Sequence, residues 1–177
     1  MRRKKTTNEL YGTKQVAAIL GVPEWRVKNF SEGKAYRLPP SIRAGSGRGS
    51  RRLYGWADIF RIGLADRLSK FGLTPGSVGQ AVREIPESMF TPYAAMLQAH
   101  HPESEGMLKR KETPLLVNVG GLWQVKRATE AQHIFAEATE HGGSSRALFV
   151  INLANLFDAI FSRLYWYWTG ELHEKGE

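Results

Sequence analysis

Two groups of side chains in the first third of the chain have the chemistry to bind nucleic acid. Arg26, Lys28 and Asn29 stand close together and carry donors that suit base edges or phosphates. Four arginines lie in or near the glycine-rich segment 44–49. A guanidinium can donate two parallel hydrogen bonds to a phosphate, and glycines allow the backbone to come close to a duplex. These residue types therefore indicate a polyanionic partner.

Two short helices are predicted to carry the first group. Apolar residues at helical spacing predict a helix over residues 14–20. Gly21 ends it, and Pro23 can open the next helix because a proline in the first turn loses no helical hydrogen bond. On that second helix, Val27 and Phe30 are three residues apart and can face the first helix. Two short helices joined by a tight glycine-containing turn are typical of a helix-turn-helix, whose second helix enters the DNA major groove.

The basic loop that follows is predicted to form a β-hairpin with a glycine-rich tip, known as a wing. Pro39 and Pro40 stop helix and favour extended backbone before it. A solvated basic loop is the alternative for this segment taken alone. Its place directly after the two helices favours the wing. Its proposed phosphate-binding residues are Arg43, Arg48, Arg51 and Arg52.

The positive charge is concentrated in the same part of the chain. Residues 1–56 hold thirteen Lys or Arg and three Asp or Glu, a net charge of +10. The whole chain has 25 basic and 17 acidic residues, so the remainder holds 12 and 14, a net charge of −2. Positive charge confined to one module is typical of a nucleic-acid partner. A membrane surface is the alternative partner for residues 2–5, but it leaves the arginines of the loop unexplained.

Composition excludes several other classes of site. The chain has no cysteine, which excludes disulfides and thiolate metal sites. No apolar stretch approaches the roughly 20 residues of a membrane span, and no apolar run follows the basic start, so we expect a soluble cytoplasmic protein without a secretory signal. His100 and His101 are neighbours on a predicted helix and point about 100° apart, so we expect no metal there.

No pattern of catalytic residues stands out, and we expect neither an enzyme nor a bound cofactor. Residues 45–49 lack the lysine of a phosphate-binding P-loop and do not connect a strand to a helix. Serine, histidine and aspartate occur, but no spacing singles out a catalytic triad.

Residues 10–85 resemble the DNA-binding domain of the MerR-type transcriptional regulators. Residues 22–30 look like the recognition segment of that family, and residues 52–54 are similar to its Arg-x-Tyr wing end. Residues 57–68 and 71–78 resemble its second helix pair. Residues 28–30 depart from the family's usual Arg-Tyr-Tyr.

The resemblance implies a winged helix-turn-helix that binds a pseudo-palindromic operator in double-stranded DNA as a homodimer. It also implies RNA polymerase as a partner, because in that family the dimer distorts the promoter so that polymerase can engage it. Together with the patterns above it predicts a set of DNA contacts, namely Lys14, Trp25, Arg26, Lys28, Asn29, Arg37, Arg43, Arg48, Arg51, Arg52 and Tyr54.

The remainder of the chain is expected to form a second module. We expect a basic arm over residues 1–10, the DNA-binding domain over 11–86, a helix and linker over 87–113, and a small α/β module over 114–177. In that module, strands on either side of a Gly-Gly turn at 120–121 predict a β-hairpin, which a helix, a further strand and a last helix follow.

The last helix, predicted over residues 153–168, has apolar residues spaced alternately by four and three. This spacing is typical of a coiled-coil seam and predicts a dimer surface. The seam would consist of Leu153, Phe157, Ile160, Leu164 and Tyr167. Trp123 and Trp166 are the suggested lining of a site for a small-molecule effector, although packing is the commoner role of such residues.

The predicted fold class is mainly α with a small β component (α+β). It comprises an N-terminal winged helix-turn-helix and a C-terminal α/β module that ends in a dimerisation helix. The predicted function is a sequence-specific DNA-binding transcriptional regulator. Two alternatives stay open at this point: an architectural or recombination accessory DNA-binding protein without effector sensing, and an enzymatic C-terminal module that the N-terminus recruits to DNA.

Overall fold

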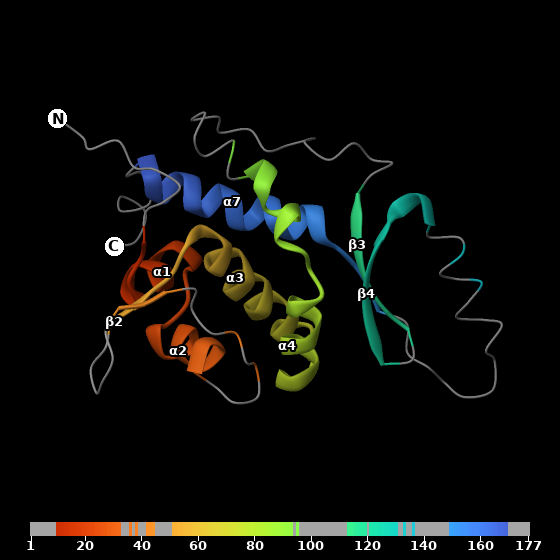
Figure 1. Cartoon of the computed structure of the whole chain (residues 1–177), viewed down its shortest axis with the longest axis horizontal. Helices are drawn as coiled ribbons and strands as arrows, with labels where there is room; N and C mark the ends of the chain where they lie inside the picture. The colour runs from red at the N-terminus through yellow and green to blue at the C-terminus, as the bar shows by residue number, and fades with distance from the viewer. Residues whose placement is uncertain are drawn as a thin grey trace.

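The computed structural model describes residues 10–32, 36, 38, 42–44, 51–93, 95, 113–119, 121–130, 133, 136 and 149–169. These residues combine helices with a small antiparallel sheet, which confirms the α+β class (Figure 1). The elements are α1 (Thr13–Leu20), α2 (Glu24–Glu32), β1 (Ile42–Ala44), β2 (Arg51–Leu53), α3 (Trp56–Lys70), α4 (Pro75–Arg83), η1 (Glu87–Met89), β3 (Pro114–Val119), β4 (Leu122–Arg127), η3 (Ala128–Glu130), β5 (Phe149–Asn152) and α7 (Leu153–Thr169).

Helix α1 ends, and α2 begins, close to where the sequence predicts. The side-chain oxygen of Gln15 accepts a hydrogen bond of 2.8 Å from the Gly12 amide at the start of α1. Gly21 ends α1 at φ 63°, a left-handed conformation that glycine adopts without strain. Val27 and Phe30 of α2 are fully buried, as their spacing predicts.

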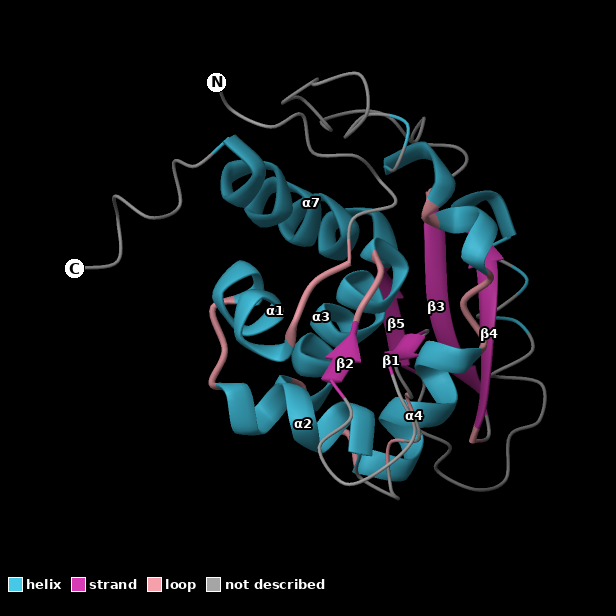
Figure 2. Cartoon of the chain, turned by 60° about the vertical axis from the view of Figure 1, so that its left-hand side comes forward, coloured by secondary structure: helices cyan, strands magenta, loops and turns pink. Residues whose placement is uncertain are grey.

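A short antiparallel pair, β1–β2, follows α2 and ends beside the start of α1. Tyr11 and Tyr54 form an isolated antiparallel bridge there, and each amide donates to the other's carbonyl at 2.9 Å. Figure 2 shows β2 next to α1 and α2. The bridge therefore holds the pair against the two helices although its strands are only three residues long.

Helix α3 lies at the centre of the molecule and is buried on several sides. Its apolar residues Ile59, Phe60, Ile62, Leu64 and Leu68 have almost no exposed surface. A helix that is buried around most of its circumference needs cover from several elements. Helices α1, α2, α4 and α7 all contact α3 and provide that cover.

Helix α4 connects the α2 side of the molecule to the sheet. Thr74 caps its first turn and Pro75 occupies the first helical position, where each residue type favours the start of a helix. Gly79 lies so close to the Tyr36 carbonyl that an added Cβ would come within 2.2 Å of its oxygen. Arg83 Nη1 donates to the same oxygen at 3.2 Å. The segment that follows α2 is therefore anchored on α4 at Tyr36.

The three-stranded sheet has the order β4-β3-β5, and both pairs are antiparallel. Register pairs Val119 with Leu122, so two residues connect β3 to β4, which confirms the predicted hairpin. Trp123 is buried on the helix side of the sheet, and its Nε1 donates to Ser77 Oγ of α4 at 3.0 Å. The expected helix after β4 falls mostly outside the described residues.

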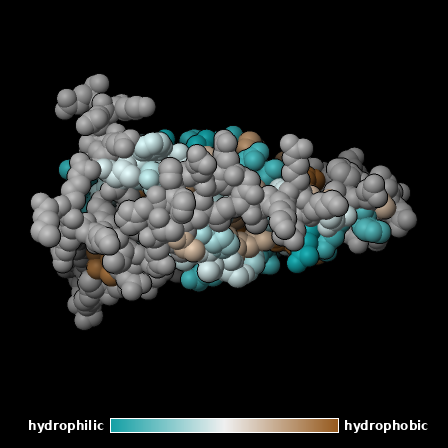
Figure 3. Space-filling view, turned by 90° about the horizontal axis from the view of Figure 1, so that it is seen from above, coloured by the Kyte–Doolittle hydropathy of each residue, from teal (hydrophilic) through white to brown (hydrophobic). Residues whose placement is uncertain are grey.

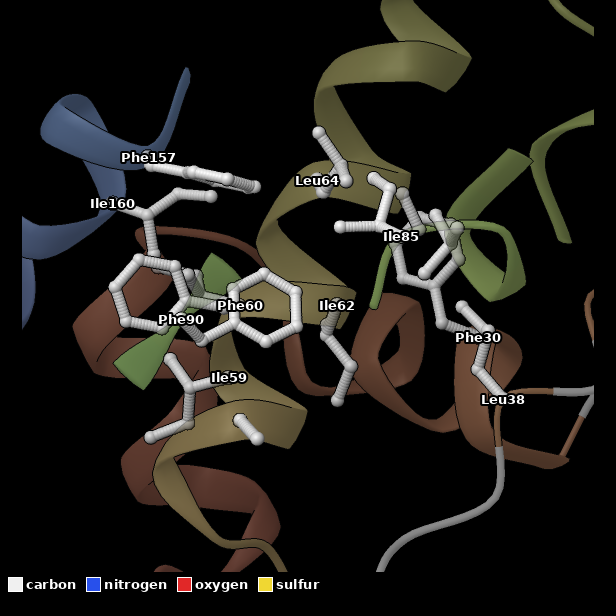
Figure 4. Packing of buried hydrophobic residues seen from close by; sticks show 14 of the residues in the cluster. Phe30, Leu38, Ile59, Phe60, Ile62, Leu64, Ile85, Phe90, Phe157 and Ile160 are labelled. Carbon is white, nitrogen blue, oxygen red and sulfur yellow. The ribbon is translucent and has the colours of Figure 1, made fainter. Parts of the chain in front are cut away.

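Helix α7 corrects the predicted dimer seam. Leu153, Phe157, Ile160 and Leu164 are buried within the chain itself, because α7 crosses back over α3 and α1. Figure 4 shows Phe157 and Ile160 beside Phe60 of α3, and the rings of Phe157 and Phe60 are 6.0 Å apart at an edge-to-face angle of 80°. These four seam residues form core rather than a surface for a second subunit.

The second half of α7 also contacts the N-terminal part of the chain. Tyr167, the fifth seam residue, is half-buried and packs edge-to-face on Tyr11 at 6.3 Å. Arg163 Nε donates to the Ile19 carbonyl of α1 at 2.9 Å. Among the described residues visible from above in Figure 3, hydrophobic colour occurs only in small separate patches.

The N-terminal helices and the sheet share one hydrophobic core. Phe90 and Tyr93, which belong to the expected linker region, are buried between α3 and α7, with Phe90 and Phe157 rings 5.2 Å apart. The Tyr93 hydroxyl donates to Asp158 Oδ1 at 3.2 Å. Burial raises the pKa of Tyr93, and the charge of Asp158 and this hydrogen bond raise it further.

None of the helices within the described ranges has the length and apolar character needed to cross a membrane.

Candidate nucleic-acid interface

The exposed side of α2 brings together three of the residues predicted to contact DNA. Trp25 is 62% exposed, and Lys28 and Asn29 are exposed beside it. Residues three and four apart on a helix are neighbours on its surface. We call Trp25, Lys28 and Asn29 the α2 face. The opposite side of the helix packs through Val27 and Phe30, so the local fold turns this face to solvent.

Arg26, another predicted DNA contact, does not belong to the α2 face because an ion pair holds it against α3. Its Nε lies 2.5 Å from Oδ1 of Asp66 on α3, and its guanidinium lies 5.6 Å from the centre of the Phe30 ring. Lys70 Nζ lies 2.7 Å from the other Asp66 oxygen. Asp66 itself is buried, so it attracts Arg26 strongly. Arg26 therefore fixes α2 to α3.

Tyr54 is also a packing residue rather than a DNA contact. It is completely buried, and its hydroxyl lies 3.0 Å from Ser31 Oγ of α2. The Ser31 hydroxyl in turn donates to the Val27 carbonyl at 3.0 Å. The Arg-x-Tyr pattern thus ends β2 with a side chain that points into the core.

The β1–β2 pair places Arg52 next to the end of α2. Register sets Arg43 opposite Arg52. The Arg52 guanidinium forms an ion pair with Glu32 at the end of α2. Arg51 stands opposite Ala44 in the same register. The Arg52–Glu32 ion pair therefore links β2 to the end of α2.

The remaining predicted contacts differ in their surroundings. Lys14 is exposed on α1. Neither Lys14 nor Lys28 forms an ion pair with another described residue, so both charges are open to a partner. Arg37 and Arg48 lie outside the described residues.

The sequence did not indicate which acidic residues pair with Arg26 and Arg52. Asp66 is 40 residues from Arg26 and Glu32 is 20 residues from Arg52, so no local spacing pairs them. The signal available in the sequence was the position of Asp66 among the apolar residues of α3, four residues before Lys70. A carboxylate among core positions needs a cationic partner because burial of an unpaired charge is costly.

The sequence matches no protein-family model and no curated protein. The case for nucleic-acid binding therefore rests on the geometry and charge of the chain itself.

The two tryptophans suggested as an effector site do not line one site. Trp123 packs between the sheet and α4, whereas Trp166 is 41% exposed and packs on Tyr165 near the other end of α7. Trp166 lies 13 positions along α7 from Leu153 beside the sheet, roughly 20 Å at 1.5 Å per residue.

No group of three or more His, Asp or Glu residues that could hold a metal ion occurs in the part of the chain that the structure describes. The pair His100–His101 falls outside that part.

Proposed function

We propose that this chain is a sequence-specific double-stranded-DNA-binding transcriptional regulator that reads the major groove with α2. The observation that carries the proposal is the α2 face: Trp25, Lys28 and Asn29 are exposed together on a short helix that is fixed on its other sides. A recognition helix has to present base-reading side chains on a support that does not move.

The β1–β2 pair supports the proposal as a wing. The ion pair between Arg52 and Glu32 sets β2 beside the end of α2, so a duplex on the α2 face would lie close to the strands that carry Arg43, Arg51 and Arg52. Those arginines suit phosphate, which positions a protein on DNA without reading its sequence. The net charge of +10 within residues 1–56 agrees with a DNA partner for this part of the chain.

The proposal includes a homodimer on a pseudo-palindromic operator. One short helix that exposes three such side chains reads only a few base pairs, which gives poor discrimination in a genome. Two copies spaced by one helical turn, roughly 34 Å, would read two half-sites. The former seam residues cannot hold this dimer, because four of them are core. Contact with RNA polymerase and response to an effector are further parts of the regulator role that the MerR resemblance implies.

Selection from a pool of random duplexes tests the proposed function. We expect enrichment of one short motif in two inverted copies with centres about 10 base pairs apart. Binding of duplex without enrichment would favour an architectural or recombination accessory protein instead. Failure to retain duplex at low salt, where phosphate contacts are strongest, would contradict both.

A further inference from the structure

The α2 face has an unusual composition for a helix that reads bases. Arginine bound to guanine is the commonest specific contact in the major groove. Arg26 is the only arginine of α2, and Asp66 holds it against α3. The α2 face therefore offers an indole, an amide and one ammonium group, but no guanidinium.

Two of these groups favour A·T pairs. The side-chain amide of asparagine can donate to adenine N7 and accept from adenine N6 at the same time, a two-bond match that other bases do not provide. Apolar surface contacts the C5-methyl group of thymine, which stands out in the major groove. Trp25 has a large apolar surface that is 62% exposed, with no packing reason in the described structure for that exposure.

The spacing of the two groups suits neighbouring base pairs. Trp25 and Asn29 are four residues apart on α2, which places their Cβ atoms about 5–6 Å apart. Base pairs rise by about 3.4 Å along a strand, so the side chains can reach adjacent or next-adjacent pairs. Lys28 lies between them along the helix and can bind a phosphate or a guanine at the edge of the same site.

We propose that α2 recognises an A·T-containing half-site, with Trp25 packed on a thymine methyl group and Asn29 paired with adenine. This inference rests on the proposed function and names the base pairs that its recognition helix reads.

Thymine methyl groups can be removed one at a time, which tests the role of Trp25. The duplex selected from the random pool is resynthesised with deoxyuridine in place of single thymidines. Burial of one methyl group contributes about 0.8 kcal/mol, so deoxyuridine at the contacted position should weaken binding about fourfold. Trp25→Ala should bind the thymidine and deoxyuridine duplexes equally. Phe71→Ala is the matched control, because Phe71 is an exposed aromatic outside the α2 face, and it should respond to deoxyuridine as the wild type does.

The adenine contact has a corresponding test. Replacing one adenine by 7-deazaadenine removes N7, and with it one of the two hydrogen bonds, so wild-type binding should weaken about fivefold at the contacted position. Asn29→Ala should bind both duplexes equally. Circular dichroism of both variants checks that the fold is intact.

The outcomes separate the two proposals. A selected motif with G·C pairs at its centre, or the same deoxyuridine response in wild type and Trp25→Ala, would overturn the inference and leave DNA binding in place. A chain that retains no duplex would overturn the proposed function and the inference with it.

Discussion

At the residue scale, the partners of the basic side chains decide which of them can meet DNA. Arg26 and Lys28 stand two positions apart, yet Arg26 is bound to Asp66 and Lys28 is exposed without a described ion pair. The sequence predicted correctly that Val27 and Phe30 face inward. It could not separate Arg26 from Lys28, because that separation depends on a carboxylate 40 residues away on α3.

Asp66→Asn should therefore destabilise the protein and weaken DNA binding although Asp66 is not in the interface. Loss of the carboxylate leaves Arg26 and Lys70 without their counter-charge, and we expect a loss near the lower end of about 1.5–3 kcal/mol because both cations are partly exposed. Urea denaturation measures the change. Glu84→Gln, which alters an exposed carboxylate at the C-cap of α4, should change the unfolding free energy by less than about 0.5 kcal/mol. Equal stability of the two variants would show that Asp66 does not fix α2 to α3 through Arg26.

The buried hydrogen bond between Tyr54 and Ser31 gives a second prediction at the residue scale. Tyr54→Phe removes the hydroxyl that meets Ser31 in the core, and should cost about 1 kcal/mol of unfolding free energy without a change in DNA affinity of the folded protein. A double-mutant cycle with Ser31→Ala measures the coupling between the two hydroxyls. If Tyr54→Phe weakens DNA binding and leaves stability unchanged, the residue contacts DNA as the MerR resemblance implied.

At the scale of elements, a glycine and a proline correctly predicted the boundary between α1 and α2. Gly21 ends α1 and Pro23 directly precedes α2, as the sequence predicts, because each residue acts on its own backbone. Strand β5 next to β3 and the anchoring of Tyr36 on α4 could not be predicted in this way. Both are long-range contacts for which no local residue pattern exists.

Helix α4 offers a matched pair of glycines for testing the Tyr36 contact. Gly79→Ala drives a methyl group into the Tyr36 carbonyl, and we expect a destabilisation of about 1–3 kcal/mol. Gly76→Ala lies in the same helix with nothing within 4 Å of the added methyl, so its higher helix propensity should stabilise the protein by up to about 1 kcal/mol. Thermal unfolding of both variants measures the difference. A stabilising Gly79→Ala would show that Tyr36 does not pack on α4.

At the scale of the whole molecule, α7 joins the C-terminal sheet to the N-terminal helices in one core. The apolar width of α7 was visible in the sequence and was interpreted as a dimer seam. The apolar positions of α3 were visible too, and a helix that is apolar on several sides needs cover from its own chain. Whether α7 covers α3 or a second subunit depends on three-dimensional packing. The spacing of apolar residues along the chain does not decide it.

Phe157→Ala separates a core role of α7 from a dimer role. The ring contacts Phe60, Phe90 and Tyr93, so its loss should cost about 3–5 kcal/mol and lower the stability of the N-terminal helices together with the sheet. Trp166→Ala, at an exposed position of the same helix, should cost much less. Urea denaturation followed by circular dichroism gives the free energies, and sedimentation gives the mass. If the wild type is a dimer and the Phe157→Ala variant is a fully stable monomer, α7 forms a dimer surface after all.

The central claim, that the α2 face reads DNA sequence, is tested most directly by the ratio of affinities for the selected duplex and for a scrambled duplex of equal length. Specific sites are typically bound at least about 10³-fold more tightly than non-specific DNA, and we expect a ratio of that order for the wild type. The triple variant Trp25→Ala, Lys28→Ala, Asn29→Ala should bring the ratio close to one while weak, salt-sensitive binding persists through the remaining basic residues. An unchanged ratio in a folded triple variant would contradict the claim and place recognition elsewhere on the chain.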